Sequence, residues 1–372
     1  MLPTSIVACN EKAPLNKQEV IMNKKIFLSL LVLSLAGLII LLLREGGMIT
    51  PKGNDVTELE IGAFESYSLP EYVLPFVTKD YKSYFVEVEP GIKIHVLEVG
   101  SGYPVYLQHG NPTSGLLYRR VAKELPRDRF RLIMPTLVGL GFSSKIPASQ
   151  HTLNNHIRWL NKTLKQLKIK NLIFVGQDWG GPIGMGALAL SPGLIKGTVL
   201  LNTGFKAPDQ PIDLSDAHAI VKMPFIGELL LETFISIFKR LPQMQGDPQS
   251  IPPEVIRLYE EPLKSSGNEK APLALMRMVP DGPSHPSTRE MKLIEEYVQS
   301  LRIPAEIVWG IRDPILGNGL ELMKRSFPDA SVTETQAGHF LQEEVYTEIA
   351  ESIIRIADKI IIEKKPSSSK KN

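Results

Sequence analysis

GQDWG, at residues 176–180, is the stretch of this sequence that decides the fold, and it directly follows the apolar run 171–175. Glycines on both sides of one polar residue, between an apolar run and a stretch of small residues, predict a sharp turn from a strand into a helix. Such a turn strains its middle residue and lifts that side chain above the edge of the sheet. Asp178 is therefore predicted to present an attacking carboxylate. The alternative is that Asp178 caps the N-terminus of the following helix.

An aspartate nucleophile restricts the chemistry that this turn can carry. Attack by a carboxylate gives a covalent alkyl ester, which suits displacement at a saturated carbon better than acyl transfer. The substrate should therefore contain a leaving group or a strained ring.

Two further segments place polar residues at the ends of strand-like runs. HGNPTS, at residues 109–114, follows the run 105–108, and Asp313 ends the short apolar strand 307–313, well before His339. The chain order of nucleophile, acid and histidine is that of the α/β-hydrolase arrangement, in which the acid holds the tautomer of a histidine that swings over the turn. A lone acid or histidine at a strand end is usually a turn cap or a polar residue whose hydrogen bonds are satisfied. The prediction of a catalytic site therefore depends on finding the nucleophile, the acid and the histidine together in this order.

The rest of the chain fits an α/β-hydrolase fold with a mostly parallel eight-stranded sheet, flanking helices and an inserted helical cap domain. Two runs, 81–89 and 92–99, indicate an antiparallel start. Shorter apolar runs follow near residues 105, 131, 172, 198, 306 and 331. Runs of this kind, buried on both faces, are typical of parallel strands covered by helices. Between residues 206 and 301 helical pieces with prolines replace the strands, which predicts the cap.

The motifs together resemble the haloalkane dehalogenase branch of the α/β-hydrolase superfamily. The matching residues are HGNPTS at 109–114, GQDWGG at 176–181, GLGFS at 139–143, and the pair Asp313 and His339. The resemblance covers roughly residues 81 to 357.

The resemblance implies a role for each residue of the first reaction step. Asp178 would attack the halogen-bearing carbon, while the indole of Trp179 and the side-chain amide of Asn111 hold the departing halide. Donors are needed there because an unsolvated anion in a dry pocket costs several kcal/mol. The backbone N–H groups of Asn111 and Trp179 would form the oxyanion hole of this fold. Simpler interpretations are core filling for Trp179 and a turn position before proline for Asn111.

The same residues account for a second step. His339 would take a proton from water, the hydroxide would attack the ester of Asp178, and Asp313 would stay ionised and orient the imidazole. No metal, nucleotide or organic cofactor is required for this reaction, and the partners are a small apolar halogenated or epoxide substrate and water.

One feature departs from some members of that branch, which place the acid after the sixth strand. The equivalent run, 198–203, ends in a neutral residue, so the acid is Asp313, after the seventh strand. This combination resembles a less studied subgroup, from which the mechanism can be carried over but not the substrate range.

Two other functions remain open on the sequence alone. Epoxide hydrolases use the same Asp, acid and His but protonate the opening ring with cap tyrosines, for which Tyr259 and Tyr297 are the candidates. The other is a non-catalytic, membrane-tethered relative that binds a small molecule or a protein. The presence of nucleophile, acid and base together argues against it, because binding alone does not need all three.

The N-terminus contains an uncharged apolar run, 26–43, of 18 residues, at the lower limit for spanning a bilayer. It predicts a transmembrane signal anchor; a cleaved secretory signal, giving a secreted protein, and a buried helix are the alternatives. Lysines 12, 17, 24 and 25 before the run outnumber the basic residues after it, which places the N-terminal arm in the cytoplasm and a membrane-anchored, single-pass catalytic domain outside.

The predicted domain boundaries follow from these segments. They are a cytoplasmic arm at 1–25, the anchor at 26–43, a tether and lead-in at 44–80, the hydrolase core at 81–205 and 302–363, the cap at 206–301, and a disordered basic tail at 364–372. With 42 basic and 40 acidic residues, the net charge of +2 gives no reason to expect nucleic-acid binding. The one cysteine excludes an intramolecular disulfide.

Overall fold

The structure, a computed structural model, describes most of the chain. The described residues are 28–29, 31–32, 34–35, 37, 45–214, 216–223, 226–228 and 236–364. The chain divides into two units, Met1–Arg44 and Glu45–Asn372, and the second contains the sheet and all the residues discussed below.

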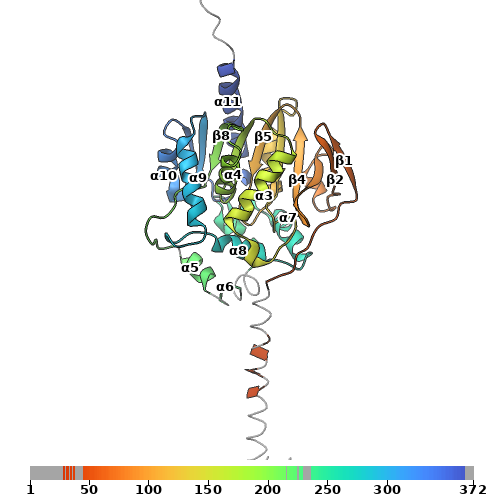
Figure 1. The fold of residues 1–372 in the computed structure, drawn as a ribbon, viewed down its shortest axis with the longest axis vertical. Helices are drawn as coiled ribbons and strands as arrows, with labels where there is room; N and C mark the ends of the chain where they lie inside the picture. Colours follow the sequence, from red (N-terminus) through yellow and green to blue (C-terminus); the bar gives the residue numbers. More distant parts are fainter. Residues whose placement is uncertain are drawn as a thin grey trace, which may run out of the picture. The chain divides into compact units, whose positions relative to one another are not determined.

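One sheet of ten strands forms the centre of the part of this unit that the structure describes (Figure 1). The strands are β1 (Asp55–Leu59), β2 (Gly62–Ser66), β3 (Lys82–Glu89), β4 (Ile92–Gly100), β5 (Tyr103–Gln108), β6 (Phe130–Pro135), β7 (Leu172–Gln177), β8 (Ile195–Leu201), β9 (Ala305–Gly310) and β10 (Ser331–Thr335). Their order in the sheet is β1-β2-β3-β4-β6-β5-β7-β8-β9-β10. Strands β1 to β4 and β6 pair antiparallel, and the strands from β6 to β10 pair parallel.

Helices cover both faces of this sheet, which explains why β7 is buried along its whole length. In Figure 1, α3 (Leu153–Gln166), α4 (Gly180–Ala189) and α9 (Thr288–Ser300) lie side by side in front of the strands. Behind them, α11 (Tyr346–Lys364) packs against β8 and β9 and against α2 (Arg119–Glu124); the short α10 (Leu320–Ser326) joins β9 to β10. The predicted fold class, a mostly parallel sheet flanked by helices, is confirmed.

The register of the central strands brings four loops together. Gln108 at the end of β5 pairs with Gly176, and Gln177 at the end of β7 pairs with Leu201 at the end of β8. Because the carboxyl ends of parallel strands lie at the same edge of a sheet, the loops after β5, β7, β8 and β9 gather at that edge. This edge is where ligands bind in open α/β sheets.

The insertion between β8 and β9 is helical in its described residues, as the sequence predicted. It contains α5 (Asp216–Lys222), α6 (Ile226–Glu228), η5 (Phe238–Met244), η6 (Pro248–Ser250), α7 (Pro253–Lys264) and α8 (Lys270–Arg277). Helix α9 follows them and packs against α4, so the last helix of the predicted 206–301 segment covers the sheet.

The lead-in to the core contains structure for which the sequence predicted only a tether. Strands β1 and β2 form a hairpin, and β2 pairs antiparallel with β3 through Glu65↔Phe85 and Ser66↔Tyr84. The hairpin therefore extends the predicted eight-stranded sheet at its antiparallel edge. Its strands are largely exposed, so their sequences lack the apolar pattern that marks a buried strand.

The prediction of a membrane-anchored, single-pass protein is wrong for the described part of the chain. None of the helices described there combines the length and the apolar character needed to cross a bilayer. The 19 residues of α11 are long enough, but charged side chains such as Glu351, Arg355 and Asp358 interrupt its apolar positions. Within 26–43, the structure describes only residues 28, 29, 31, 32, 34, 35 and 37; the remainder of the predicted anchor and most of the predicted tail at 364–372 lie outside the described residues.

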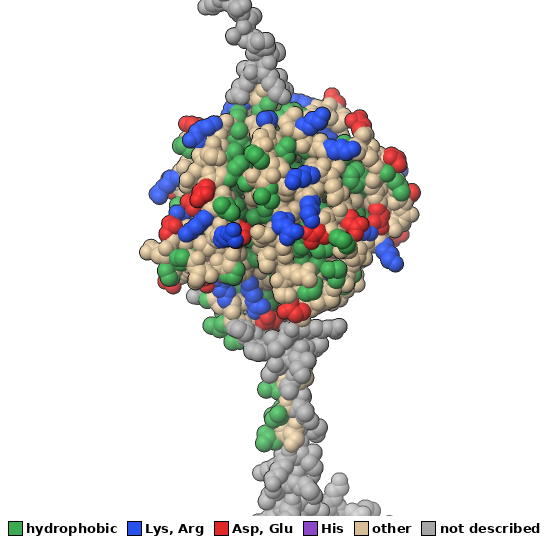
Figure 2. Space-filling model, viewed as in Figure 1, with side chains coloured by type: hydrophobic (Ala, Val, Ile, Leu, Met, Phe, Trp, Pro, Cys, Tyr) green, Lys and Arg blue, Asp and Glu red, His purple; other side chains and the backbone are tan. Residues whose placement is uncertain are grey.

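The surface carries charges of both signs in close alternation. Figure 2 shows Lys and Arg side chains interspersed with Asp and Glu side chains on the face in view, with small apolar areas between them. This distribution fits a chain whose 42 basic and 40 acidic residues nearly cancel.

Candidate active site

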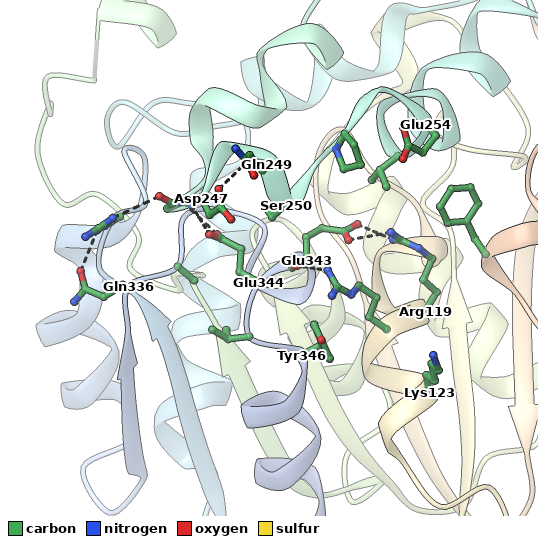
Figure 3. A pocket seen from close by; sticks show the side chains of 18 of the residues that line it. Arg119, Lys123, Asp247, Gln249, Ser250, Glu254, Gln336, Glu343, Glu344 and Tyr346 are labelled. Carbon is green, nitrogen blue, oxygen red and sulfur yellow. Dashed lines mark hydrogen bonds and ion pairs between the residues drawn. The ribbon is translucent and has the colours of Figure 1, made fainter.

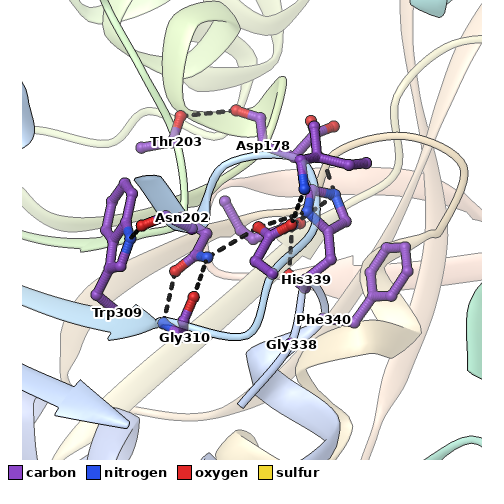
Figure 4. A network of polar contacts seen from close by, with 12 residues as sticks. Asp178, Asn202, Thr203, Trp309, Gly310, Gly338, His339 and Phe340 are labelled. Carbon is purple, nitrogen blue, oxygen red and sulfur yellow. Dashed lines mark hydrogen bonds and ion pairs between the residues drawn. The ribbon is translucent and has the colours of Figure 1, made fainter. Parts of the chain in front are cut away.

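Asp178 occupies the sharp turn that the sequence predicted, between the end of β7 and the start of α4. Its φ of 50° lies in the left-handed region, which costs a non-glycine residue energy that its surroundings must supply. The end of β8 holds it: the Asp178 N–H donates to the Asn202 carbonyl at 3.0 Å, and the Thr203 hydroxyl donates to the Asp178 carbonyl at 2.7 Å (Figure 4).

The glycine after this turn is required by a close approach of two loops. A Cβ added at Gly180 would lie 2.2 Å from the carbonyl oxygen of Gln108, at the end of β5. A larger residue would push the loop after β5 away from the carboxylate, so the glycine keeps Asn111 beside Asp178.

The two carboxylate oxygens of Asp178 have different environments. Oδ1 accepts a hydrogen bond from the Asn111 backbone N–H at 2.8 Å, and the Trp179 backbone N–H also bonds this carboxyl group. Oδ2 lies 3.9 Å from Nε2 of His339, and the side chain keeps 17% of its surface exposed. Oδ1 is therefore held by a backbone donor, and Oδ2 faces the histidine.

Burial raises the pKa of Asp178, and this outweighs the opposing effects of His339 and of the Trp179 and Asn111 amides. A carboxylate that is poorly solvated is a stronger nucleophile than one in water, provided that it is ionised.

His339 lies over the turn and is bonded to the predicted acid. Its Nδ1 lies 2.8 Å from Oδ2 of Asp313, and both side chains are buried (Figure 4). Burial alone would lower the pKa of His339, but the charges of Asp313 and Asp178 and the Asp313 hydrogen bond raise it above its usual range. Because Nδ1 donates to Asp313, Nε2 carries the lone pair and faces Asp178.

Asp313 is held ionised by several donors. Burial alone would raise the pKa of Asp313; the His339 charge and hydrogen bonds from His339, Asn202 and the Ile315 amide outweigh it and lower that pKa. The Asn202 side-chain amide donates to Oδ2 at 2.8 Å, and the Ile315 N–H donates to Oδ1 at 2.7 Å.

The predicted halide donors, Asn111 and Trp179, are both at the site but differ in what they bind. The Asn111 side-chain Nδ2 donates to the carbonyl of Pro272 on α8 at 3.0 Å, which uses one of its two hydrogens. The indole N–H of Trp179 makes no hydrogen bond with any residue that the structure describes. Trp179 is therefore the more available donor, and Asn111 also connects the loop after β5 to the cap.

Asn202 and Gln177 contribute to the site, although the sequence analysis assigned them no role. Asn202, with φ of 23°, donates to Asp313 and to the Gly310 carbonyl and accepts from the Gly310 N–H. Gln177 donates from Nε2 to the His339 carbonyl at 3.0 Å. Both are polar residues at the ends of buried parallel strands, beside the strand or turn that carries a catalytic candidate. That position is the signal that could have identified them.

The cap tyrosines considered for ring protonation are not equivalent in the structure. Tyr259 on α7 donates to Glu343 at 2.8 Å and accepts from Arg119 at 3.4 Å, in a buried network whose charged pair is shown in Figure 3. Tyr297 lies on α9, which packs against α4, and its buried hydroxyl has no hydrogen-bond partner among the described residues. The hydroxyl of Tyr259 is thus hydrogen-bonded to the Arg119–Glu343 ion pair, outside the site.

One cap residue does lie within electrostatic reach of the nucleophile. His218 on α5 is half-buried, and burial lowers its pKa, while the Asp178 charge opposes that shift. The cap therefore brings a titratable side chain toward the site.

Comparisons with known proteins identify relatives of this chain in sequence and in fold. Residues 103–240 match the family model described as alpha/beta hydrolase fold. A cis-3-alkyl-4-alkyloxetan-2-one decarboxylase of Shewanella oneidensis is 33% identical over 281 residues, covering 72% of this chain and 86% of that protein. Haloalkane dehalogenase 2 of Mycobacterium tuberculosis is 26% identical over 266 residues, covering 70% and 90%. The solved structure of haloalkane dehalogenase DatA from Agrobacterium tumefaciens has a TM-score of 0.69 at 25% identity, covering 77% of this chain and 99% of that one.

Proposed function

Because this chain belongs to the haloalkane dehalogenase branch of the α/β-hydrolase superfamily, we propose that it is a hydrolase that cleaves carbon–halogen bonds through an alkyl ester on Asp178. The observation that carries the proposal is the difference between the two oxygens of Asp178. Oδ1 is bound by the Asn111 amide at 2.8 Å, whereas Oδ2 faces His339 at 3.9 Å, on a side chain that keeps 17% of its surface exposed. One oxygen is thus placed to become an oxyanion and the other to attack.

In the first step, Oδ2 of Asp178 attacks the carbon that carries the halogen. The Oδ2–C bond forms as the C–halogen bond breaks, and the halide leaves with the bonding electron pair. The free indole N–H of Trp179 and the second hydrogen on Nδ2 of Asn111 would stabilise this anion, which has lost its water shell.

In the second step, water hydrolyses the ester. Nε2 of His339 accepts a proton from the water, and the hydroxide attacks Cγ of Asp178. The negative charge then develops on Oδ1, which the backbone amide of Asn111 already binds, and the Trp179 amide, which bonds the same carboxyl group, would also donate to it. Collapse of this intermediate breaks the Cγ–Oδ2 bond and releases the alkoxide, which takes the proton from His339. Asp178 then loses its remaining proton to solvent and retains one solvent oxygen.

A second candidate is supported by the 33% identical relative, whose name states that it decarboxylates cis-3-alkyl-4-alkyloxetan-2-ones. The same attack suits a strained four-membered lactone. Oδ2 would bond to ring carbon 4, and the bond between this carbon and the ring oxygen would break to give a free carboxylate. Loss of carbon dioxide would then form the carbon–carbon double bond and expel Asp178 unchanged, without hydrolysis. Epoxide opening is less well supported, because the hydroxyl of Tyr259 is bound to Glu343.

An assay with matched substrates separates these functions. We expect the purified full chain to release bromide from 1-bromobutane and 1,2-dibromoethane, in proportion to alcohol formed. The comparison substrates are styrene oxide and a cis-3,4-dialkyloxetan-2-one. Alkene and carbon dioxide from the lactone without any bromide release would assign the decarboxylase function. Diol from styrene oxide without bromide release would assign the epoxide hydrolase function.

The pH dependence of turnover should report His339. The base must be unprotonated, so kcat is expected to rise with pH through the pKa of His339, which its carboxylate partners hold above 6.5 in the free enzyme. Once Asp178 is esterified its charge is gone, and Asp313 alone keeps the pKa of His339 raised. Asp313→Asn should therefore move the midpoint of kcat to lower pH as well as reduce the plateau. A midpoint that Asp313→Asn leaves unchanged, measured between about pH 5 and about pH 9, would contradict this assignment of the base.

A further inference from the structure

The loop that carries His339 is bonded to a segment of the cap, residues 244–247. The His339 N–H donates to the Met244 carbonyl at 2.8 Å, and the Phe340 N–H donates to Oε1 of Gln245 at 2.9 Å. Gln245 also donates from Nε2 to the Phe340 carbonyl at 3.1 Å. Residues of the cap insertion therefore bond the backbone of His339 and of the residue that follows it.

Glu344 connects the same two segments through its carboxylate. Oε2 accepts from the Gly338 N–H at 2.7 Å and from the Gly246 N–H at 3.2 Å, and Oε1 accepts from the Asp247 N–H at 2.6 Å. Figure 3 shows Glu344 beside Asp247 at this junction. Three backbone donors on one carboxylate form charge-assisted hydrogen bonds, which are about twice as strong as neutral ones.

The two backbones joined by Glu344 are in direct contact. A Cβ added at Gly338 would lie 2.2 Å from the Met244 carbonyl oxygen, and one added at Gly246 would lie 2.0 Å from that of Gln336. No space remains between the segments to absorb a shift. A displacement of residues 244–247 would therefore be passed to Gly338 and to the histidine that follows it.

The charge of Glu344 is compensated by these amides. No ion pair with Glu344 occurs among the residues that the structure describes, and the neighbouring Arg312 instead donates from Nε to the Gln336 side chain at 3.0 Å. Glu344 also borders an open cavity of about 920 Å³, shared with Asp247, Glu254 and Arg312 (Figure 3). Loss of the carboxylate would leave three amides without their acceptor at a junction that water can reach.

We propose that Glu344 is a positioning residue for catalysis, which ties cap segment 244–247 to the His339 loop and thereby aligns Nε2 for hydrolysis of the ester. This inference depends on the proposed function, because it assigns Glu344 to the second step of that reaction. Glu344 contacts neither Asp178 nor the oxyanion donors in the described structure, so the first step does not depend on it in the same way.

Glu344→Gln tests this role because it keeps the size of the side chain and removes the charge. A carboxamide presents an NH2 group where the carboxylate accepts, so one or more of the three amides loses its bond. We expect the initial burst of bromide, one per active site, to keep its rate. Steady-state turnover of 1-bromobutane should fall about 10- to 100-fold, because a base displaced by a fraction of an ångström activates water poorly. The ester should accumulate as added mass on the peptide containing Asp178.

Glu254→Gln is the matched control, since Glu254 is an exposed glutamate that borders the same cavity and makes no hydrogen bond or ion pair among the described residues. It should leave burst and steady state unchanged. An equal fall of the rates of both phases in folded Glu344→Gln protein would overturn the positioning role, as would an unchanged steady state. If Glu344→Gln does not fold, Gln245→Met provides the test, because it removes the side-chain bonds to Phe340. This variant must keep the rate of the bromide burst and lose steady-state turnover. If it does not, the proposal is overturned. A wild-type chain that releases no bromide at all from either bromoalkane would instead contradict the proposed function.

Discussion

Asp178→Asn is expected to abolish bromide release, with a rate at least about 10⁴-fold below that of the parent chain. The substitution keeps the shape of the side chain, and the carbonyl oxygen of asparagine can still accept from the Asn111 amide that binds Oδ1 at 2.8 Å. The atom that faces His339, however, is then an NH2 group without an available lone pair for attack on carbon. The fold should persist because the turn is held through the backbone by Asn202 and Thr203.

The measurement is bromide release from 1-bromobutane, with mass analysis of the peptide that contains residue 178. That analysis is needed because asparagine slowly deamidates to aspartate and would restore activity. Asp209→Asn, at an exposed aspartate that bonds Lys206, is the control for the chemical change itself and should retain full activity. Turnover at the parental rate by Asp178→Asn protein whose mass shows no deamidation would refute the covalent mechanism.

His339→Phe should separate the two steps of the reaction. Alkylation of Asp178 needs no base, so one bromide per active site is expected at close to the parental rate. Hydrolysis should fall about 10³-fold or more, because the substitution removes the base whose Nε2 faces the Asp178 carboxylate. The trapped ester should appear as an added alkyl mass on the peptide containing Asp178.

Two comparisons make this result specific. The double variant Asp178→Asn, His339→Phe should give neither the bromide burst nor the added mass. With a cis-3,4-dialkyloxetan-2-one, the decarboxylation route expels Asp178 without water, so His339→Phe should trap no ester from that substrate even if it is consumed. Continued multiple turnover of 1-bromobutane by His339→Phe, without trapped mass, would exclude His339 as the base for hydrolysis.

The sequence predicted the parts of the site that follow from strand ends. Asp178 and Asp313 follow apolar runs, and His339 follows the more polar strand β10. Parallel strands bring such positions to one edge of the sheet, where the structure places all three. The hydrogen bonds of Asn202 were not predictable in the same way. They depend on the pairing of β8 with β9, which brings Asn202 next to Gly310 and Asp313, and a single sequence does not state that pairing.

Other features escaped prediction for different physical reasons. The β1–β2 hairpin is exposed, so hydrophobic periodicity does not mark it. Most of the bonds between residues 244–247 and the His339 loop join a backbone group to the side chain of Gln245 or Glu344, and no residue type identifies which backbone groups these side chains reach. The anchor prediction rested on an apolar run at the lower limit for a bilayer and on the charged residues that flank it, and no described helix supports it.

The bond between the Asn111 side chain and the Pro272 carbonyl on α8 has a consequence for protein engineering. Together with the contacts of residues 244–247, it means that the cap and the catalytic loops are not independent modules. A chimera that receives the cap of a relative would also exchange groups that bond Asn111 and the His339 loop, the proposed halide donor and the loop of the proposed base. Grafts that aim to change substrate preference alone should therefore keep Met244 to Asp247 and Pro272 of the recipient and exchange only the residues between or outside them.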